Sequence, residues 1–195
     1  MLYLASKSPR RRELLARLGL SPGLLDLDLP EVRQPGETAL DYVRRVAREK
    51  AGAGLLKVMS TPGAVVLAAD TEVVLDDQVF GKPVDEEDAR AMLARLSGRT
   101  HQVISVVWVM DASREAQAIS TTDVTFAALT PVQIDGYLAS GEWDGKAGAY
   151  AIQGLAEAFV TRIEGSYSGV MGLPVHETAA LLADFGIDVF AGREA

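Results

Sequence analysis

Cysteine is absent from this sequence, and histidine is scarce. The 195 residues include no cysteine and two histidines, His101 and His176. Without cysteine the chain cannot form disulfide bonds, thiolate metal sites or a cysteine nucleophile, and this composition fits the reducing cytoplasm. The two histidines stand far apart in the sequence, with no acidic residue or histidine at ligand spacing around them, which argues against a zinc site.

Long apolar runs and an excess of positive charge are also lacking. No stretch reaches the roughly 18–20 apolar residues of a membrane span. The short apolar start, followed by its basic cluster, does not have the pattern of a signal peptide. The formal net charge of -8 disfavours general binding to nucleic acid or to an anionic membrane. We therefore expect a cytoplasmic protein that binds neither.

The basic residues that do occur are concentrated near the N-terminus. Residues 1–50 carry 10 Lys and Arg against 7 Asp and Glu, whereas the remaining residues carry 9 against 20. Aromatic side chains do not alternate with the later basic residues, so a single-stranded RNA surface is not indicated. A positive site on an acidic protein suits a small anionic ligand.

Apolar periodicity predicts alternating strands and helices. Ser8 is placed to cap a helix that has Pro9 in its first turn, and Gly19 is placed to end it. The apolar run 64–69 predicts a central strand that ends at Asp70, with 72–75 extended beyond it. Further strands are expected at 2–5, 103–110, 118–129 and 158–163, and helices at 9–18, 38–56, 85–96, 130–140 and 174–185. This order predicts a single α/β domain over residues 1–195, with a mixed twisted sheet and flanking helices.

The stretch LASKSPRRRELL, residues 4–15, places three arginines at the expected start of the first helix. A helix dipole is positive at its N-terminus, so carboxylates and not cations would be stabilising there. Free backbone N–H groups, the hydroxyls of Ser6 and Ser8, and arginine side chains together suit a bound phosphate. A solvated basic turn is the alternative.

Two further motifs place a charged side chain at the end of a strand or in a rigid turn. In AADT, Asp70 and Thr71 follow a buried strand, and open α/β sheets commonly bind ligands at this end of their strands. An aspartate there could bind Mg²⁺ or accept a proton from water. In GKP, Pro83 stiffens the turn that carries Lys82, a fixed positive charge suited to phosphate. The alternatives are an aspartate that caps a turn and an ordinary surface turn.

The segments GKAGAYAIQG, residues 145–154, and EGSYSGVMGLP, residues 164–174, are rich in small residues. Glycine lets a ligand approach the backbone closely. The amide of Gln153 can both donate and accept a hydrogen bond at the edge of a base. Simple turn geometry is the alternative explanation for the glycines.

Taken in order, the motifs resemble those of the Maf family of nucleoside triphosphate pyrophosphatases. They are LASKSPRRRELL, EKA, AADT, FGKP, LSGRTHQV, GKAGAYAIQG and GSYSGVMGLP, from Leu4 to about Leu182. The resemblance implies an α/β fold similar to that of inosine triphosphate pyrophosphatases, with two lobes around a cleft. It also implies attack of water on the α-phosphorus of a nucleoside triphosphate, which gives the monophosphate and pyrophosphate. A divalent metal cation, Mg²⁺ or Mn²⁺, is the implied cofactor.

The resemblance also implies roles for individual residues. Asp70 matches the proton-accepting aspartate, and the candidate metal ligands are Asp70 and Glu31. The implied phosphate-binding residues are Ser6, Arg10, Arg11, Lys50 and Lys82, and the implied specificity residues are Arg10, Thr71 and Gln153. The chain departs from the family pattern at Pro30, where an acidic residue is common, and at Gly169, where asparagine is frequent. Whether Asp70 acts as general base or as metal ligand stays open.

The segment AGAYAIQG resembles the subgroup that acts on dTTP and UTP. The same chemistry on 7-methyl-GTP, or on non-canonical purine triphosphates such as ITP, is one alternative. A nucleotide-binding regulator of cell division is another, because the family has been labelled as septum formation inhibitors. The resemblance also suggests a homodimer.

Overall fold

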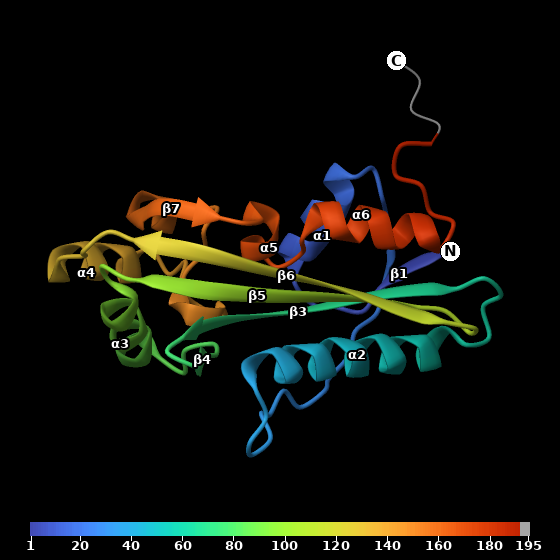
Figure 1. The fold of residues 1–195 in the computed structure, drawn as a ribbon, viewed down its shortest axis with the longest axis horizontal. Coiled ribbons are helices and arrows are strands. Elements are labelled where there is room, and N and C mark those ends of the chain that lie inside the picture. The colour runs from blue at the N-terminus through green and yellow to red at the C-terminus, as the bar shows by residue number, and fades with distance from the viewer. Residues whose placement is uncertain (192–195) are drawn as a thin grey trace.

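A computed structural model describes residues 1–191 of the chain, and its centre is a mixed sheet. The strand order is β2-β1-β3-β5-β6-β7, with β4 paired to β3 (Figure 1). Pairing is parallel between β1 and its neighbours β2 and β3, and antiparallel elsewhere. The strands are β1 (Leu2–Leu4), β2 (Gly23–Leu24), β3 (Val65–Leu75), β4 (Gln78–Phe80), β5 (Thr100–Met110), β6 (Glu115–Phe126) and β7 (Val160–Glu164). The predicted mixed α/β sheet is confirmed.

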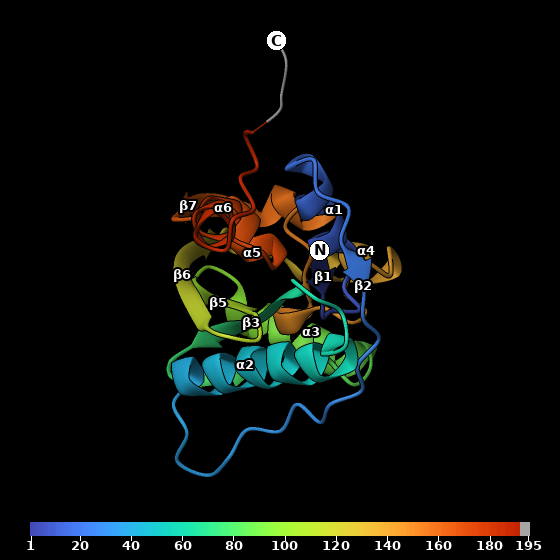
Figure 2. The same cartoon turned by 90° about the vertical axis from the view of Figure 1, so that its right-hand side faces the viewer.

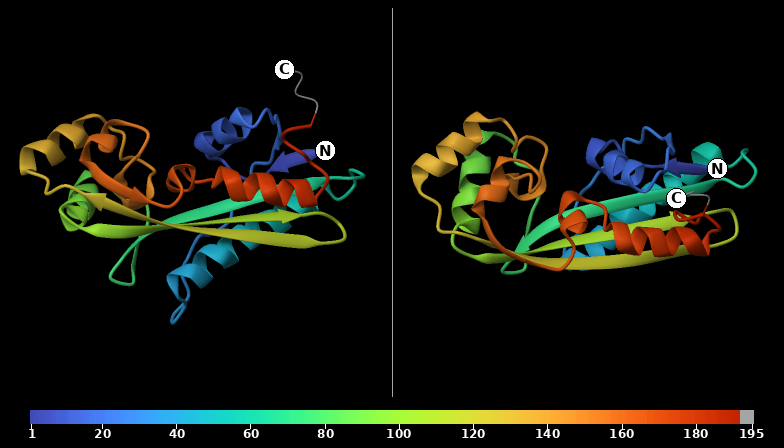
Figure 3. Two further views of the ribbon diagram at one scale, coloured as in Figure 1. Left: turned by 45° about the horizontal axis from the view of Figure 1, so that its top comes forward. Right: turned by 90° about the horizontal axis from the view of Figure 1, so that it is seen from above.

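Helices cover both faces of this sheet. Helix α2 (Ala39–Val58) lies along one face, and α1 (Pro9–Arg17), α5 (Tyr167–Met171) and α6 (Val175–Asp184) lie on the other (Figures 1 and 2). Helices α3 (Glu86–Leu96) and α4 (Pro131–Ala139) gather at one end of the long strands, away from α1 and α6 (Figure 3). Strands β3, β5 and β6 connect the two ends. Within residues 1–191, no helix is long and apolar enough to cross a membrane.

Local sequence signals set the starts of three helices. Thr38, Asp85 and Thr130 precede α2, α3 and α4, and the side-chain oxygen of each accepts a hydrogen bond from the backbone N–H three residues later. Ser8 precedes α1 as predicted, but its side chain makes no capping hydrogen bond. The first turn of α1 is therefore not capped by a side chain.

The sheet separates two apolar cores. Val66 and Ala68 of β3 pack on the α2 side, whereas Leu67 and Ala69 pack on the side of α1 and α6. Successive side chains of a strand point to opposite faces. Positions 70 and 72 of β3 therefore face α2, and position 71 faces α1.

The central strand does not end at Asp70, which corrects the prediction. Strand β3 runs unbroken to Leu75, because β5 pairs with it from Val66 to Val74. On its other edge, β1 pairs with β3 only as far as Leu67, and β4 pairs only from Val73. Asp70 thus lies in the middle of a strand edge that neither β1 nor β4 covers.

Three short helices in or next to the two glycine-rich segments were not predicted from the sequence. The 3-10 helix η1 (Ala147–Ala149) lies in the first segment and α5 in the second, and the 3-10 helix η2 (Leu155–Phe159) directly follows the first. Because η2 occupies the start of the predicted strand 158–163, β7 begins only at Val160. Gly172 ends α5 at a φ of 116°, a conformation that L side chains rarely adopt.

Candidate active site

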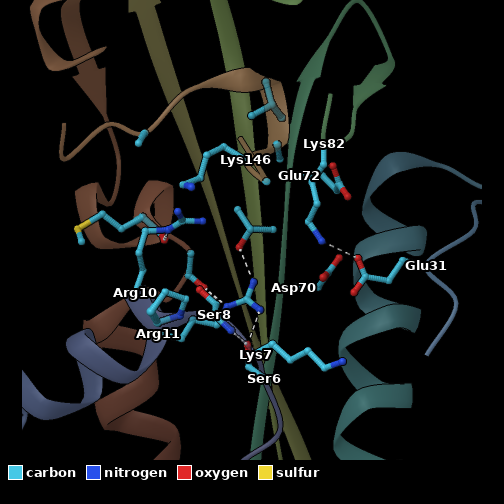
Figure 4. A pocket seen from close by; sticks show the side chains of 18 of the residues that line it. Ser6, Lys7, Ser8, Arg10, Arg11, Glu31, Asp70, Glu72, Lys82 and Lys146 are labelled. Atoms are coloured by element: carbon cyan, nitrogen blue, oxygen red, sulfur yellow. Dashed lines mark hydrogen bonds and ion pairs between the residues drawn. The ribbon is translucent and has the colours of Figure 1, made fainter. Parts of the chain in front are cut away.

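A pocket of about 640 Å³ opens at the uncovered edge of β3. Its walls come from the β1–α1 turn, residues 27–31, α2, β3, the turn after β4, and residues 145–153. The structure therefore brings together segments that are distant in the sequence (Figure 4). All the predicted site residues line this pocket: Ser6, Arg10, Arg11, Glu31, Lys50, Asp70, Thr71, Lys82 and Gln153.

Arg11 is a buried cation with fixed geometry. Its Nε donates to the Gly172 carbonyl at 2.8 Å, its Nη1 to Ser6 Oγ at 3.1 Å, and its Nη2 to Thr71 Oγ1 at 3.3 Å. Burial lowers the pKa of Arg11, and the carboxylates across the strand oppose that shift. A guanidinium has five N–H donors, so the remaining ones are available to a ligand.

Thr71 and Ser105 extend the Arg11 network into the sheet. Thr71 Oγ1 lies 2.7 Å from Ser105 Oγ, which in turn donates to the Gly169 carbonyl at 2.7 Å. Ser105 has a single hydroxyl proton, so Thr71 must donate to Ser105 while it accepts from Arg11. Thr71 therefore orients Arg11 and has no proton left for a ligand. The sequence did not predict a role for Ser105, because only the strand register places it opposite Thr71.

Arg10 and Lys146 add two positive charges to the same wall. Arg10 Nε donates to the Met171 carbonyl at 3.3 Å, and Lys146 Nζ to the Asp144 carbonyl at 2.7 Å, but neither has an ion-pair partner within residues 1–191. Burial lowers the pKa of both groups; Arg11 lowers that of Arg10 further, and Arg10 lowers that of Lys146. Neighbouring cations without a counter-ion make a wall suited to an anion. Lys146 lies in a motif that sequence analysis singled out, but it was given no role.

The N-terminus of α1 borders this cationic wall. Ser8 and Pro9 line the pocket, and the first turn carries no side-chain cap, so its backbone N–H groups can serve an anion. The three arginines of the motif separate here. Arg10 and Arg11 enter the pocket, whereas Arg12 is exposed and lies outside its lining.

Carboxylates and lysines form the opposite wall. Lys50 Nζ donates to Asp70 Oδ1 at 2.8 Å and lies 2.6 Å from Glu31 Oε1, and Lys82 Nζ lies 3.4 Å from Glu31 Oε2. Asp70 is 5% exposed, and its Oδ2 has no hydrogen-bond partner in the described part of the chain. Burial alone would raise the pKa of Glu31, but Lys50 and Lys82 outweigh it and the pKa is lowered.

Glu72 is a further carboxyl group of this wall, and the sequence did not predict it. It follows Asp70 by two positions on β3 and so shares its face. Burial first, and then the charges of Asp70 and Glu31, raise the pKa of Glu72 to about 8. The spacing of the two acids in DTE, within an extended segment, was the signal that could have identified it.

Gln153 and Tyr150 complete the lining at the glycine-rich segment. Gln153 is exposed, and its side chain makes no hydrogen bond within residues 1–191. Tyr150 is buried, with its hydroxyl 2.8 Å from His101 Nε2. His101 therefore supports the pocket wall from inside the core.

The two walls lie on opposite faces of β3 but open into one pocket. Figure 4 shows Arg10, Arg11 and Lys146 on one side and the carboxylates with Lys82 on the other. The first wall can hold a polyanion, and a buried carboxylate with a free oxygen can take a proton or ligate a cation. Within residues 1–191, no three His, Cys, Asp or Glu side chains are arranged to hold a metal ion by themselves.

Comparisons with known proteins match nearly the whole chain. The family model described as Maf-like protein matches residues 1–185. A protein of Xanthomonas campestris pv. campestris named dTTP/UTP pyrophosphatase is 58% identical over 188 residues, which cover 95% of this chain and 99% of that protein. One of Xylella fastidiosa (strain M23) named nucleoside triphosphate pyrophosphatase is 57% identical over 186 residues, covering 95% and 98%. Among solved structures, the Staphylococcus aureus Ham1 protein matches with a TM-score of 0.44 and 14% identity over 65% of this chain and 71% of that one.

Proposed function

This chain belongs to the Maf-like protein family, and we propose that it hydrolyses nucleoside triphosphates to the monophosphate and pyrophosphate, with dTTP and UTP preferred. The observation that carries the proposal is the pocket at the β3 edge. There, cations without an ion-pair partner in residues 1–191 face a buried carboxylate that has one oxygen free of hydrogen bonds in the same range. The names of relatives that are 58% and 57% identical support the same activity.

The triphosphate binds along the cationic wall. Arg10, the free N–H groups of Arg11 and the Ser6 hydroxyl donate to phosphate oxygens. The Ser6 proton is available because, within residues 1–191, Ser6 Oγ only accepts hydrogen bonds. Lys82 adds a positive charge from its exposed turn. We also assign Lys50 a role in phosphate binding. Its ammonium group has three N–H donors, and its contacts with Glu31 and Asp70 use two of them, so one can reach a phosphate oxygen.

Asp70 acts on the water that attacks the α-phosphorus. The water oxygen forms the new bond to phosphorus, the bond from the α-phosphorus to the bridging oxygen breaks, and pyrophosphate leaves. Asp70 Oδ2 takes the proton of the water, while Lys50 on Oδ1 fixes the orientation of the carboxylate. Arg10 and Arg11 stabilise the charge that develops on the phosphate oxygens.

A divalent cation, Mg²⁺ or Mn²⁺, is the cofactor that we assign to this site. The donor set fits, because Mg²⁺ is commonly held by one or two carboxylates together with substrate phosphates. Buried carboxylate oxygens that have no hydrogen-bond partner in the described residues line the pocket. Asp70 and Glu31 are the ligands that the sequence predicts. When bound, the cation supplies Lewis-acid polarisation of the phosphate oxygens. An Asp70 oxygen bound to a cation would be a weaker base, so the two roles of Asp70 compete.

Base choice is assigned to Gln153, Arg10 and Thr71. The exposed Gln153 amide has a donor and an acceptor, as the edge of uracil or thymine requires. Thr71 acts indirectly: it accepts a hydrogen bond from Arg11 and so orients the guanidinium that binds the substrate phosphate.

The location and assembly state are part of the same proposal. A free pool of nucleoside triphosphates and a cysteine-free chain fit the cytoplasm. We also propose a homodimer, which size-exclusion chromatography with light scattering would test by measuring the mass in solution.

The first test is the release of pyrophosphate from dTTP, UTP, CTP, ITP and 7-methyl-GTP, with and without Mg²⁺. We expect selective turnover of dTTP and UTP with the cation present. Asp70→Asn should lower kcat by about 10²–10⁴-fold, as for loss of a general base, while binding of a non-hydrolysable dTTP analogue persists. Asp77→Asn, an exposed position after the same strand, is the matched control. Wild-type turnover in Asp70→Asn would contradict the catalytic assignment, and no turnover of any substrate by the wild type would contradict the function.

A further inference from the structure

Glu72 is a buried carboxyl group that the proposed reaction does not use. Its side chain lines the pocket, the residue is 7% exposed, and its Oε2 has no hydrogen-bond partner within residues 1–191. A buried carboxyl group without a partner is unfavourable unless a ligand completes its environment. On this face of the sheet, Glu72 has the apolar side chains of Val74 along β3 and of Ile104 opposite it on β5 as neighbours, together with Asp70. An acid at this position therefore points to a ligand.

The other two carboxylates of this wall already have partners. Lys50 Nζ lies 2.6 Å from Glu31 Oε1 and 2.8 Å from Asp70 Oδ1, and Lys82 approaches Glu31 Oε2 at 3.4 Å. In the described part of the chain, Glu72 forms no such ion pair. Three carboxyl groups thus face two ammonium groups, and the unmatched group is Glu72.

We propose that Glu72 is the protein ligand of the divalent cation and binds it directly through Oε2. Glu72 and Asp70 are alternate residues of one strand, so their Cα atoms lie roughly 6.6 Å apart and their carboxylates reach the same part of the pocket. A carboxylate oxygen is the ligand that Mg²⁺ and Mn²⁺ prefer, and the substrate phosphates supply further oxygens.

This assignment separates the two roles predicted for Asp70. With the cation on Glu72, Asp70 Oδ2 stays free to take the proton from water, and Glu31 stays with its two lysines. A cation on Glu31 would instead have to displace an ammonium group, because each of the two oxygens of Glu31 faces one. The inference rests on the proposed function for the role of the cation, but cation binding can be measured without a nucleotide.

The test is a titration of Mn²⁺ into the full-length protein without nucleotide, under argon. Electron paramagnetic resonance measures the free Mn²⁺ at each step. At pH 8.5 the carboxyl group of Glu72, with its pKa of about 8, is mostly ionised. Two variants remove the Glu72 carboxylate: Glu72→Gln, and Glu72→Val, whose side chain favours a strand. A third variant, Glu31→Gln, removes the competing candidate ligand. Circular dichroism and thermal unfolding establish that each variant folds.

We expect both Glu72 variants to bind Mn²⁺ at least tenfold more weakly than the wild type, and Glu31→Gln to stay within about threefold. Wild-type affinity in a folded Glu72 variant would overturn the assignment. An equal or larger loss in Glu31→Gln, or no Mn²⁺ binding by the wild type, would overturn it as well. Pyrophosphate release by the wild type is measured separately. Turnover by the wild type together with unchanged Mn²⁺ affinity in the Glu72 variants refutes this inference alone, whereas the absence of turnover by the wild type refutes the proposed function.

Discussion

Acidification should destabilise the folded chain through His101. The ring is 1% exposed and packs edge-on against Phe126 and Tyr150, with centroid separations of 5.0 Å and 5.5 Å. Its Nδ1 has no hydrogen-bond partner in the described part of the chain. Burial lowers the pKa of His101 to about 4, so the folded protein resists a proton that the unfolded chain accepts.

The size of the effect follows from the two pKa values. A histidine in an unfolded chain has a pKa of about 6.5. As the pH falls from about 6.5 to 4, the unfolded state binds one proton more than the folded state, so the free energy of unfolding decreases. One pKa unit corresponds to about 1.4 kcal/mol, so the loss between pH 7 and pH 5 is about 2 kcal/mol. Below about pH 4 this group causes no further loss.

Urea unfolding at pH 7 and pH 5 measures this loss. His101→Gln removes the titration and keeps an amide that can reach the Tyr150 hydroxyl, so it should lose about 2 kcal/mol less than the wild type on acidification. His176 is exposed and is the other histidine of the chain, so His176→Gln is the control and should lose as much as the wild type. Equal losses in His101→Gln and the wild type would refute the reasoning.

Three further predictions concern the pocket. Gly148→Ala should destabilise the fold by about 2–4 kcal/mol in urea unfolding, because φ is +69° and the new Cβ would lie 2.8 Å from Val73 Cγ2. Gly145→Ala is the control: its φ is +66° but an added Cβ would contact nothing, so this variant has the backbone strain without the clash. Similar losses of stability in both variants would exclude the clash with Val73. Arg10→Ala should weaken dTTP binding by about 10–100-fold in calorimetry and thymidine binding clearly less; equal effects would mark Arg10 as structural. Gln153→Ala should lower the ratio of kcat/KM for dTTP over ITP, and an unaltered ratio would place base choice elsewhere.

The helix boundaries were predictable because their signals are local. Thr38, Asp85 and Thr130 each cap a helix by a contact three residues away, which a single sequence displays. The course of β3 was not predictable in this way. Two acids interrupt its apolar run, and only the pairing with β5, more than 30 positions later in the chain, keeps Asp70 extended.

The same distinction holds for the pocket. The predicted residues came from motifs, and the structure brings all of them to one cavity. Ser105 depends on strand register and Lys146 on the fold of a glycine-rich segment, neither of which has a local signal. Glu72 differs, because alternation along a strand places it on the face of Asp70. It was missed because the strand was expected to end at Asp70.

The uncovered edge of β3 explains how one pocket can use both faces of a sheet. An open strand edge is normally a liability, and proteins cover it. Here β1 leaves after Leu67 and β4 joins at Val73, so the α2 face and the α1 face meet across the intervening edge. The α2 face contributes acids and lysines, whereas the α1 face contributes arginines that the sheet keeps apart from those acids. A ligand at the edge can therefore contact the arginines and the Asp70 carboxylate at once, without the two groups neutralising each other by direct ion pairs.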